Sequence, residues 1–205
     1  MTIAISHKEL DLEIFNCVKC PGVQEFRVYP MPGFYGSDCY GQFAVIAQNP
    51  GTPNEYQRRH KFVFSEIEED YIDGLKKSPI GMFLDLILPS NINLEQVFYT
   101  NIVKCAKKEQ NLDDEAANCD KYIARQLDIV KPKIIITLGN LALRYFCPGM
   151  NIKAASLKHI EHDRRWLVLP LFHPSYLNRL SYEEGKKYIE DANKLISYHA
   201  GLIFR

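Results

Sequence analysis

A polar pair at the end of an apolar run is the first feature of this sequence that could do chemistry. Gln48 and Asn49 follow the apolar run at 43–47 and precede a stiff turn made by Pro50 and Gly51. The apolar, β-branched run predicts a buried strand, and open α/β sheets place their ligands at the carboxyl ends of such strands. Because amide side chains both donate and accept hydrogen bonds, the pair predicts a ligand site rather than core.

A second loop of the same kind contains a histidine. The stretch LPLFHPSY at 169–176 runs from an apolar segment to His173, which Pro174 follows. A histidine in such a loop can exchange a proton or donate a hydrogen bond to a developing negative charge. The two loops would face one crevice if their strands are parallel neighbours.

Four of the six cysteines have positions that could place them around one metal centre. Cys17 and Cys20 form a C-x2-C pair, and thirteen residues separate Cys105 from Cys119. Thiolates from scattered segments suit a tetrahedral zinc or an iron–sulfur cluster, while the alternative is that some are small buried hydrophobic residues. The cysteines without such partners are Cys39 and Cys147.

Strand and helix patterns alternate along the chain that must position these residues. They follow an N-terminal arm at 1–40, which we expect to be irregular and to carry two of the cysteines. Predicted strands lie at 43–47, 97–101, 133–138 and 166–171. Predicted helices lie within 65–88 and at 114–130, 139–146 and 182–199, with a turn-rich hairpin region before the last strand. The alternation predicts an α/β fold with a mostly parallel sheet between helices, in a single domain spanning 1–205.

Local signals mark the ends of two predicted helices. Residues 111–115 offer capping side chains and first-turn acids, and Pro132 ends the same helix with Lys131 at its negative pole. Ser181 and Glu184 form a capping box for the last helix.

The overall charge gives no argument for a nucleic-acid partner, because 25 basic and 25 acidic residues cancel. A basic footprint must therefore be local. Basic clusters occur at 58–61, at 164–165 and around Cys105, where they comprise Lys104, Lys107 and Lys108; each cluster alone is typical of a solvated surface. The N-terminus lacks a signal-peptide core and no apolar run reaches membrane length, so we expect an intracellular protein, cytoplasmic or nucleoid-associated.

Taken in order, the motifs of this sequence resemble the uracil-DNA glycosylase superfamily, and most closely its iron–sulfur-containing family 4. They are C-x2-C, AQNPG, KF-V at 61–63, TNIVKC, Cys119, KPKIIITLG and FHPSYLNR, and they span roughly residues 15–195. The resemblance implies a three-layer α/β/α fold with a central four-stranded, mostly parallel sheet. It also implies hydrolysis of the N-glycosidic bond of deoxyuridine in DNA during base excision repair. A structural 4Fe-4S cluster would be held by Cys17, Cys20, Cys105 and Cys119.

The resemblance also implies roles for residues of a base pocket. Phe62 would stack on a flipped uracil, Asn101 would read its O4 and N3 edge, and His173 would stabilise the leaving uracil anion at O2. A ring face, an amide and a histidine are chemically suited to these tasks. Asn49 would position the attacking water, and Gln48 would hold the pocket backbone or touch the sugar.

DNA contacts are expected from both loops, on the same resemblance. The residues concerned are Pro50, Gly51, Pro174, Ser175, Tyr176 and Arg179. Ser175 would bind a phosphate with Arg179 nearby, and Tyr176 or one of the next two residues would enter the space left by the extruded nucleotide. We therefore expect a monomer that binds uracil-containing DNA, single- or double-stranded, and no membrane.

The first loop departs from the family pattern. Family 4 typically has Gly-Glu-(Ala or Gly)-Pro-Gly, whereas this chain has AQNPG at 47–51, so a neutral Gln48 stands where glutamate is expected. Asn49 occupies the position that is aspartate in family 1 and asparagine in the mismatch-specific and single-strand-selective branches. The missing carboxylate predicts slower turnover or a preference for weakly paired uracil. It also supports an alternative, a catalytically weak or inactive glycosylase-fold protein that binds uracil-containing or single-stranded DNA.

Overall fold

One mixed sheet forms the centre of the computed structural model, which describes residues 7–20, 30–50, 76–106, 112–162 and 165–203. In the described residues its six strands run in the order β1-β3-β2-β4-β6-β5. They are β1 (Phe34–Tyr35), β2 (Phe43–Ala47), β3 (Val97–Asn101), β4 (Ile134–Leu138), β5 (Ile160–His162) and β6 (Trp166–Leu171). The four central strands are parallel, and the edge strands β1 and β5 are antiparallel to their neighbours.

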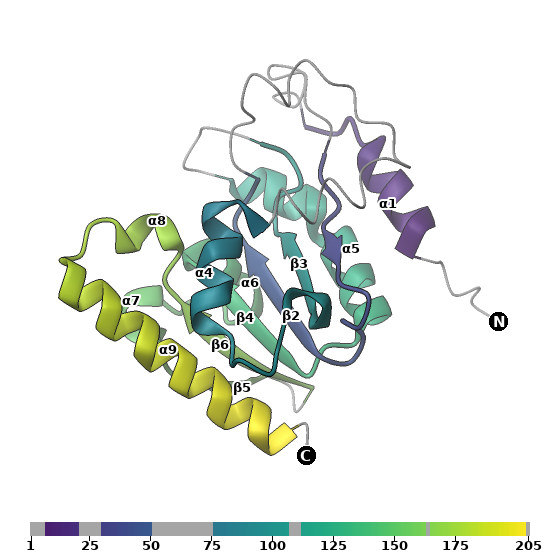
Figure 1. The fold of residues 1–205 in the computed structure, drawn as a ribbon. Coiled ribbons are helices and arrows are strands. Elements are labelled where there is room, and N and C mark those ends of the chain that lie inside the picture. The colour runs from purple at the N-terminus through teal and green to yellow at the C-terminus, as the bar shows by residue number, and fades with distance from the viewer. Residues whose placement is uncertain (1–6, 21–29, 51–75, 107–111, 163–164, 204–205) are drawn as a thin grey trace.

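Helices cover both faces of this sheet, which makes three layers (Figure 1). The described helices are α1 (His7–Phe15), α4 (Pro79–Ile87), α5 (Asp113–Val130), α6 (Asn140–Phe146), α7 (Ile152–Ala155), α8 (Pro174–Leu177) and α9 (Tyr182–Ile203), and a 3-10 turn, η2, spans Leu94–Gln96. α4 and α9 pack on one face, and α5 and α6 pack on the other. Within the described ranges, no helix is long and apolar enough to cross a membrane.

The parallel strands are mostly apolar because both of their faces are buried. Val45 and Ile136 point into the core beneath α4 and α9, while Ala44 and Ile135 point toward α5 and α6. Every residue of β2, β3 and β4 is buried. Burying one such aliphatic side chain contributes about 1.5–3 kcal/mol, so these strands form the rigid part from which the loops extend.

The four predicted strands are confirmed, and they are the four parallel strands of the centre. The expected four-stranded sheet is nevertheless too small, because short antiparallel edges extend it at both sides. β1 has two residues and β5 has three, which is too short for an alternating pattern to be recognised. β5 pairs with β6 and accounts for the hairpin region expected before the last strand.

The N-terminal arm and one helix cap differ from expectation. Part of the arm is the helix α1, whose Leu10 and Ile14 pack against Cys119 and Tyr122 of α5. α5 begins after Leu112, which makes no side-chain capping bond. Its other end follows the prediction, because Lys131 adopts a left-handed conformation with φ 51° before Pro132.

Two further helix predictions correspond to described elements. The capping box of α9 is confirmed: the Ser181 main-chain N–H donates to the Glu184 carboxylate over 2.9 Å, and the Glu184 N–H donates back to the Ser181 hydroxyl over 3.3 Å. The helical material expected within 65–88 is α4, preceded by a Ser78 cap; residues 65–75 lie outside the described residues.

Candidate functional site

The parallel order of the central strands brings the predicted site residues to one edge of the sheet. Gln48 and Asn49 follow β2, Asn101 ends β3, and His173 follows β6 by two residues. Strands β2 and β6 are parallel but not neighbours, because β4 lies between them. The two strands are therefore not the parallel neighbours that the sequence left possible, although their carboxyl ends do meet at the same edge.

Main-chain hydrogen bonds beyond the strand ends fix these loops in pairs. The N–H of Ile102 donates to the carbonyl of Ala47, and the N–H of Val103 donates to the carbonyl of Gln48, each over 2.9 Å. At the other side, the N–H of Gly139 donates to Leu171 over 2.9 Å. The first-loop residues are thus attached to β3, and the segment before His173 is attached to the end of β4.

Asn101 is almost completely buried, with 3% of its surface exposed. The Tyr99 hydroxyl donates to Asn101 Oδ1 over 3.3 Å. Burial raises the pKa of Tyr99 far above its usual range, so its hydroxyl remains a neutral donor. A buried amide with one of its two oxygen lone pairs engaged retains a second acceptor position and an N–H2 donor, which suits recognition of a polar edge.

Lys104 contacts Asn101 and is almost completely buried, with 1% of its surface exposed. Its Nζ donates to the Thr100 hydroxyl at 2.7 Å, the Asn101 carbonyl at 2.9 Å and Gln126 Oε1 at 2.6 Å. A fourth contact, at 3.3 Å, reaches the carbonyl of Pro32. Burial lowers the pKa of Lys104 to about 7. The surface-charge interpretation of this lysine is wrong, because it anchors the end of β3; Lys107 and Lys108 lie outside the described residues.

His173 caps the short helix α8 with its own side chain. The main-chain N–H of Ser175 donates to His173 Nδ1 over 3.2 Å, and the Ser175 hydroxyl lies 2.8 Å from the same nitrogen. An Nδ1 that accepts from an N–H group carries no proton, so the neutral ring is protonated at Nε2. Burial lowers the pKa of His173, which favours this neutral form. The side chain therefore presents an Nε2–H donor on the side away from α8.

The first loop has less described structure. Asn49 Nδ2 donates to the Pro50 carbonyl over 3.0 Å, which orients its amide, and Gln48 is half-buried. Two residues predicted to belong to this site, Gly51 and Phe62, lie outside the described residues, as does the basic cluster at 58–61.

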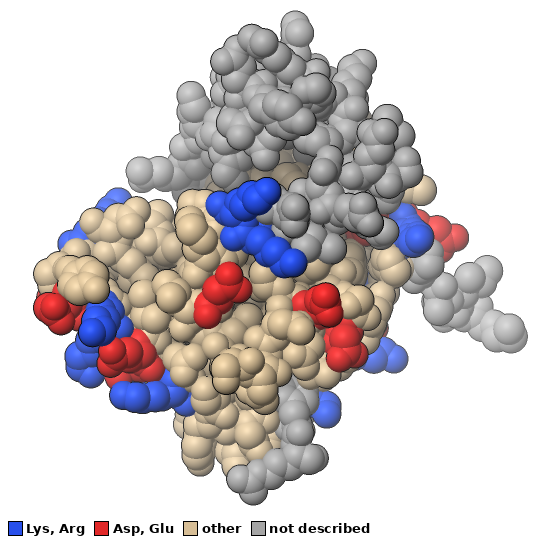
Figure 2. All heavy atoms as spheres, in the orientation of Figure 1, with Lys and Arg blue, Asp and Glu red and all other residues tan. Residues whose placement is uncertain are grey.

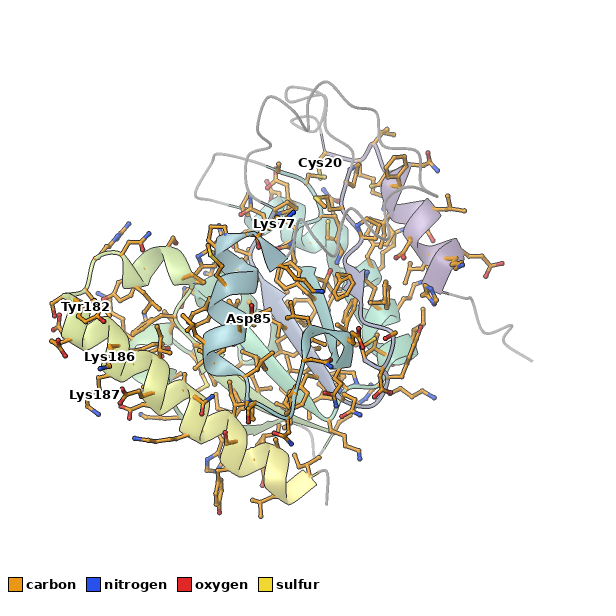
Figure 3. The ribbon with its side chains drawn as sticks, in the orientation of Figure 1. Cys20, Lys77, Asp85, Tyr182, Lys186 and Lys187 are labelled. Carbon is orange, nitrogen blue, oxygen red and sulfur yellow. The ribbon has the colours of Figure 1, made fainter. Side chains whose placement is uncertain are left out.

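In the second loop, the predicted DNA contacts lie at the surface around α8. Ser175 and Arg179 are exposed, and Tyr176 packs its ring 4.5 Å from that of Phe172. Lys76 and Lys77 are also exposed, shortly before α4, where Figure 3 labels Lys77. Figure 2 shows basic side chains gathered in this part of the viewed face, a local positive charge that no sequence motif indicated. Local charge of this kind is compatible with a chain that is neutral overall.

The four cysteines predicted as metal ligands come from three segments that meet above the sheet. Cys20, Cys105 and Cys119 are buried and Cys17 is partly exposed. Burial, and after it the negative charge that thiolates at Cys119, Cys20 and Cys17 carry, raises the pKa of Cys105 to about 12. The four thiols are therefore electrostatic neighbours. In the part of the chain that the structure describes, no three His, Cys, Asp or Glu side chains are arranged to hold a single metal ion.

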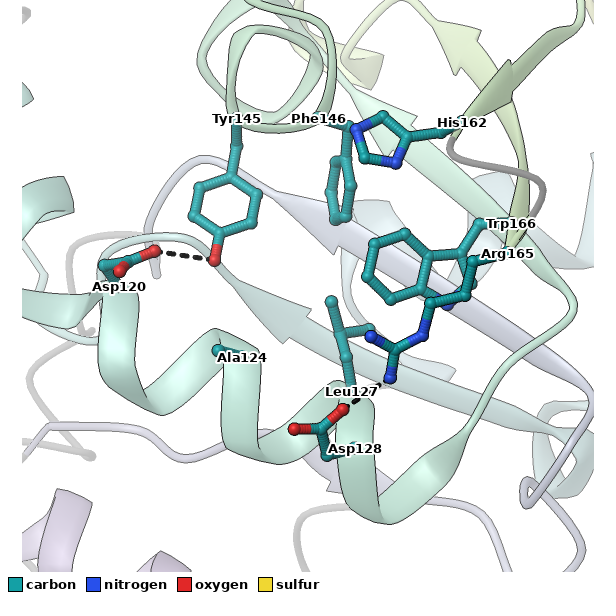
Figure 4. Close-up of a pocket in the computed structure, with 9 residues that line it drawn as sticks. All are labelled: Asp120, Ala124, Leu127, Asp128, Tyr145, Phe146, His162, Arg165 and Trp166. Atoms are coloured by element: carbon teal, nitrogen blue, oxygen red, sulfur yellow. Dashed lines mark hydrogen bonds and ion pairs between the residues drawn. The ribbon is translucent and has the colours of Figure 1, made fainter.

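A pocket of about 280 Å³ lies elsewhere, between α5, α6 and the β5–β6 hairpin (Figure 4). Trp166 forms one wall, with Arg165 4.6 Å from its ring centre. The Arg165 guanidinium pairs with Asp128 at 2.5 Å, and the Tyr145 hydroxyl donates to Asp120 over 2.8 Å. These four polar side chains of the pocket are paired with each other and none of the predicted site residues lines it, so we place the candidate site at the strand ends.

Comparison with known proteins found a matching family model and several similar proteins. A family model described as the uracil DNA glycosylase superfamily matches residues 35–197. A type-4 uracil-DNA glycosylase from Thermotoga maritima is 33% identical over 126 residues, which cover 58% of this chain and 65% of that protein. Type-4 uracil-DNA glycosylases from Saccharolobus solfataricus and Sulfurisphaera tokodaii are 30% and 28% identical, over 80% and 83% of this chain and 73% and 74% of theirs.

Proposed function

Because this chain belongs to the uracil DNA glycosylase superfamily, we propose that it is an enzyme that hydrolyses the N-glycosidic bond of deoxyuridine in DNA. The observation that carries the proposal is the position of Asn101 and His173 at one edge of the sheet, beside the first loop, in a chain that the family matches over 35–197. The type-4 relatives support the same activity.

His173 would supply the main catalytic effect as a neutral hydrogen-bond donor. Cleavage of the glycosidic bond leaves negative charge on uracil O2, and a donor held in place before the reaction stabilises that charge. The Ser175 N–H engages Nδ1, so Nε2–H is the donor available to the base. One such donor contributes on the order of 3 kcal/mol to transition-state stabilisation in other enzymes.

Asn49 would orient the attacking water, and Asn101 would read the O4 and N3 edge of the flipped base. An amide is a poorer base than a carboxylate, so water attack would be slow, with a preference for mismatched or unpaired uracil, whose flipping costs less. Phe62 is the proposed stacking surface, and Gln48 would hold the pocket backbone or touch the sugar.

The DNA strand would be held by the two strand-end loops. Ser175 and Arg179 are exposed beside the His173 loop and can bind phosphate oxygens. The other proposed DNA contacts are Pro50, Gly51, Pro174 and Tyr176. Uracil-containing DNA, single- or double-stranded, would be bound by a monomer, and action on genomic DNA would place the protein inside the cell.

The cysteine set fits a 4Fe-4S cluster with Cys17, Cys20, Cys105 and Cys119 as ligands. Four thiols, three of them buried, are electrostatic neighbours, and a cluster binds each thiolate to a different iron, so the sulfurs need not converge on one ion. The cluster would supply structural support, because glycosidic hydrolysis has no redox step. Zinc, the alternative that the cysteine spacing left open, would need its ligands around one ion, an arrangement that the described side chains do not have. Visible charge-transfer absorbance of the purified protein would exclude zinc.

The alternative function is a catalytically weak or inactive glycosylase-fold protein that binds uracil-containing or single-stranded DNA. The observation that favours it is the uncharged first loop, with Gln48 and Asn49 where a stronger base would be expected. Both functions would bind DNA at the same strand-end loops. They are therefore distinguished by whether the protein cleaves the glycosidic bond.

The deciding experiment incubates the protein with labelled oligonucleotides that contain one uracil, single-stranded, opposite adenine or opposite guanine, and then cleaves abasic sites with alkali. We expect cleavage, with single-stranded and U:G substrates preferred. His173→Ala should lower kcat by about 10²–10³-fold, as loss of a charge-stabilising donor does elsewhere, and Asn49→Ala should lower it less. If the protein bound the oligonucleotides but cleaved none of them, the binding-protein function would replace the enzyme function as the proposal. An Asn49 effect larger than that of His173 would refute the assigned roles.

A further inference from the structure

Tyr99 and Asn101 lie two residues apart on β3, so their side chains project from the same face of the sheet. The Tyr99 side chain reaches forward, and its hydroxyl donates to Asn101 Oδ1 over 3.3 Å. Both residues are buried, with 7% and 3% of their surfaces exposed. A buried hydroxyl needs a hydrogen-bond partner, and among the described residues Asn101 Oδ1 is the partner of the Tyr99 hydroxyl.

The main chain of Asn101 is held from the opposite side of β3. Lys104 Nζ donates to the Asn101 carbonyl over 2.9 Å, and the same nitrogen is held by Thr100 and by Gln126 of α5. Lys104 thus holds the main chain of Asn101 on one side of the strand, and Tyr99 bonds Oδ1 on the other. The Tyr99 bond therefore restricts rotation of the Asn101 amide about its Cβ–Cγ bond.

The orientation of that amide decides which pyrimidine it matches. Uracil presents an acceptor at O4 and a donor at N3–H, whereas cytosine presents a donor at its 4-amino group and an acceptor at N3. An amide with Nδ2 toward position 4 and Oδ1 toward N3 matches uracil. The same amide turned by half a rotation matches cytosine, so an unrestrained asparagine does not by itself distinguish the two bases.

We propose that Tyr99 is the residue that makes this site select uracil against cytosine, by holding Asn101 Oδ1 and so fixing the orientation of its amide. This inference rests on the proposed function, in which Asn101 reads the base. Oδ1 has two lone pairs, one for the Tyr99 hydroxyl and one for N3–H of uracil. In the rotated amide, Nδ2 would face the hydroxyl, whose oxygen could accept from it but whose proton would lose Oδ1 as its acceptor, so the rotated form would leave a buried O–H without this bond.

The test is Tyr99→Phe, which keeps the ring in the core and removes only the hydroxyl. We expect the preference for uracil over cytosine, measured as the ratio of kcat/KM on unpaired bases in one oligonucleotide context, to fall about tenfold, the effect of one net hydrogen bond. Tyr145→Phe is the matched control, because it removes a hydroxyl bond to Asp120 on the outer side of α5 and should leave the ratio unchanged.

A second measurement keeps the inference independent of turnover. Calorimetric affinities for free uracil and free cytosine should show the same loss of preference in Tyr99→Phe. If the wild-type protein binds uracil but cleaves no substrate, the glycosylase proposal is overturned and the proposed role of Tyr99 is not. An unchanged preference in a folded Tyr99→Phe variant, even with a lower melting temperature, would overturn the role of Tyr99. Tyr99→Leu, which also lacks the hydroxyl, provides the same comparison if the phenylalanine variant does not fold.

Discussion

At the scale of single residues, the chemistry of the site depends on which nitrogen or oxygen each side chain presents. His173 would be an ordinary loop residue if its ring could turn freely. The bond from the Ser175 N–H to Nδ1 assigns the proton of the neutral ring to Nε2 and uses the imidazole as a helix cap. Asn101 is similarly constrained by Tyr99. Polar residues at strand ends thereby become donors and acceptors of defined direction.

The state of His173 predicts the acid side of the pH profile. Burial lowers its pKa below the ordinary 6.5, so the neutral form persists into mildly acidic solution. Activity should therefore be constant near neutrality and fall as pH drops through the lowered pKa, because protonation at Nδ1 removes the acceptor that Ser175 uses. Because the pKa of His173 is lower in the folded protein than in the unfolded chain, the folded protein is favoured when this histidine is neutral. The free energy of unfolding should therefore also fall as the solution is acidified.

The pH profile can be measured as log kcat/KM against pH on a single-stranded uracil oligonucleotide. His159→Ala, which changes an exposed histidine before the β5–β6 hairpin, should leave the acid limb unmoved. An acid limb centred above pH 6.5 would contradict the assigned neutral donor.

At the scale of elements, the termini of strands and helices place the loops. α5 connects the cysteine region at Cys119 to the amino end of β4, and its last turn closes through the Lys131 N–H, which donates to Leu127 over 2.8 Å. Lys131 is left-handed, with φ 51°, a conformation that costs an L-residue with a side chain roughly 1–2 kcal/mol. Pro132 then directs the chain into β4.

This strained cap predicts a stabilising substitution. Lys131→Gly should be about 0.5–1 kcal/mol more stable than Lys131→Ala, because both lose the charge at the helix end and only glycine relieves the left-handed strain. Free energies of unfolding from denaturant titration measure the difference. Equal stability of the two variants would show that the backbone at Lys131 is not strained.

At the scale of the whole molecule, the N-terminal arm is attached to the sheet by contacts with α5. Leu10 and Ile14 of α1 pack beside Cys119, and Glu13 pairs with Lys121 at 2.6 Å and also with Arg125. The exposed ion pairs contribute little, since such pairs are typically worth 0–1 kcal/mol. A cluster held by cysteines of the arm, of the loop after β3 and of α5 would be the stronger connection.

Loss of one cysteine ligand of the proposed cluster should therefore lower the stability of the protein and leave the rate of the chemical step unchanged. Cys119→Ala is expected to lose most bound iron and to lower Tm, by about 2–4 °C for each kcal/mol lost, while kcat of the folded protein is retained at low temperature. Cys147→Ala, a buried cysteine after α6, is the matched control and should retain its iron. Iron analysis, visible absorbance and thermal unfolding provide the readouts. Full stability of an iron-free Cys119 variant would argue against a structural cluster.

The central strands, the long helices and the placement of polar residues at the strand ends could be predicted because their signals are local. An apolar run bounded by turn residues is sufficient to locate β2 or β4, and a polar residue directly after such a run is thereby placed at the sheet edge. The edge strands were missed because two or three residues carry no periodicity. α1 was missed in an arm read as irregular.

The sequence by itself determined the α/β class, the order of its parallel strands along the chain and the residues at their carboxyl ends. Only the tertiary structure decided that Lys104 is an internal anchor, that Tyr99 holds the Asn101 amide, and that β4 separates the two loops. The physical reason is that burial and hydrogen-bond direction arise from partners distant in sequence. Lys104 next to Cys105 looks like surface charge until Gln126 and Pro32, from separate segments, surround it with acceptors.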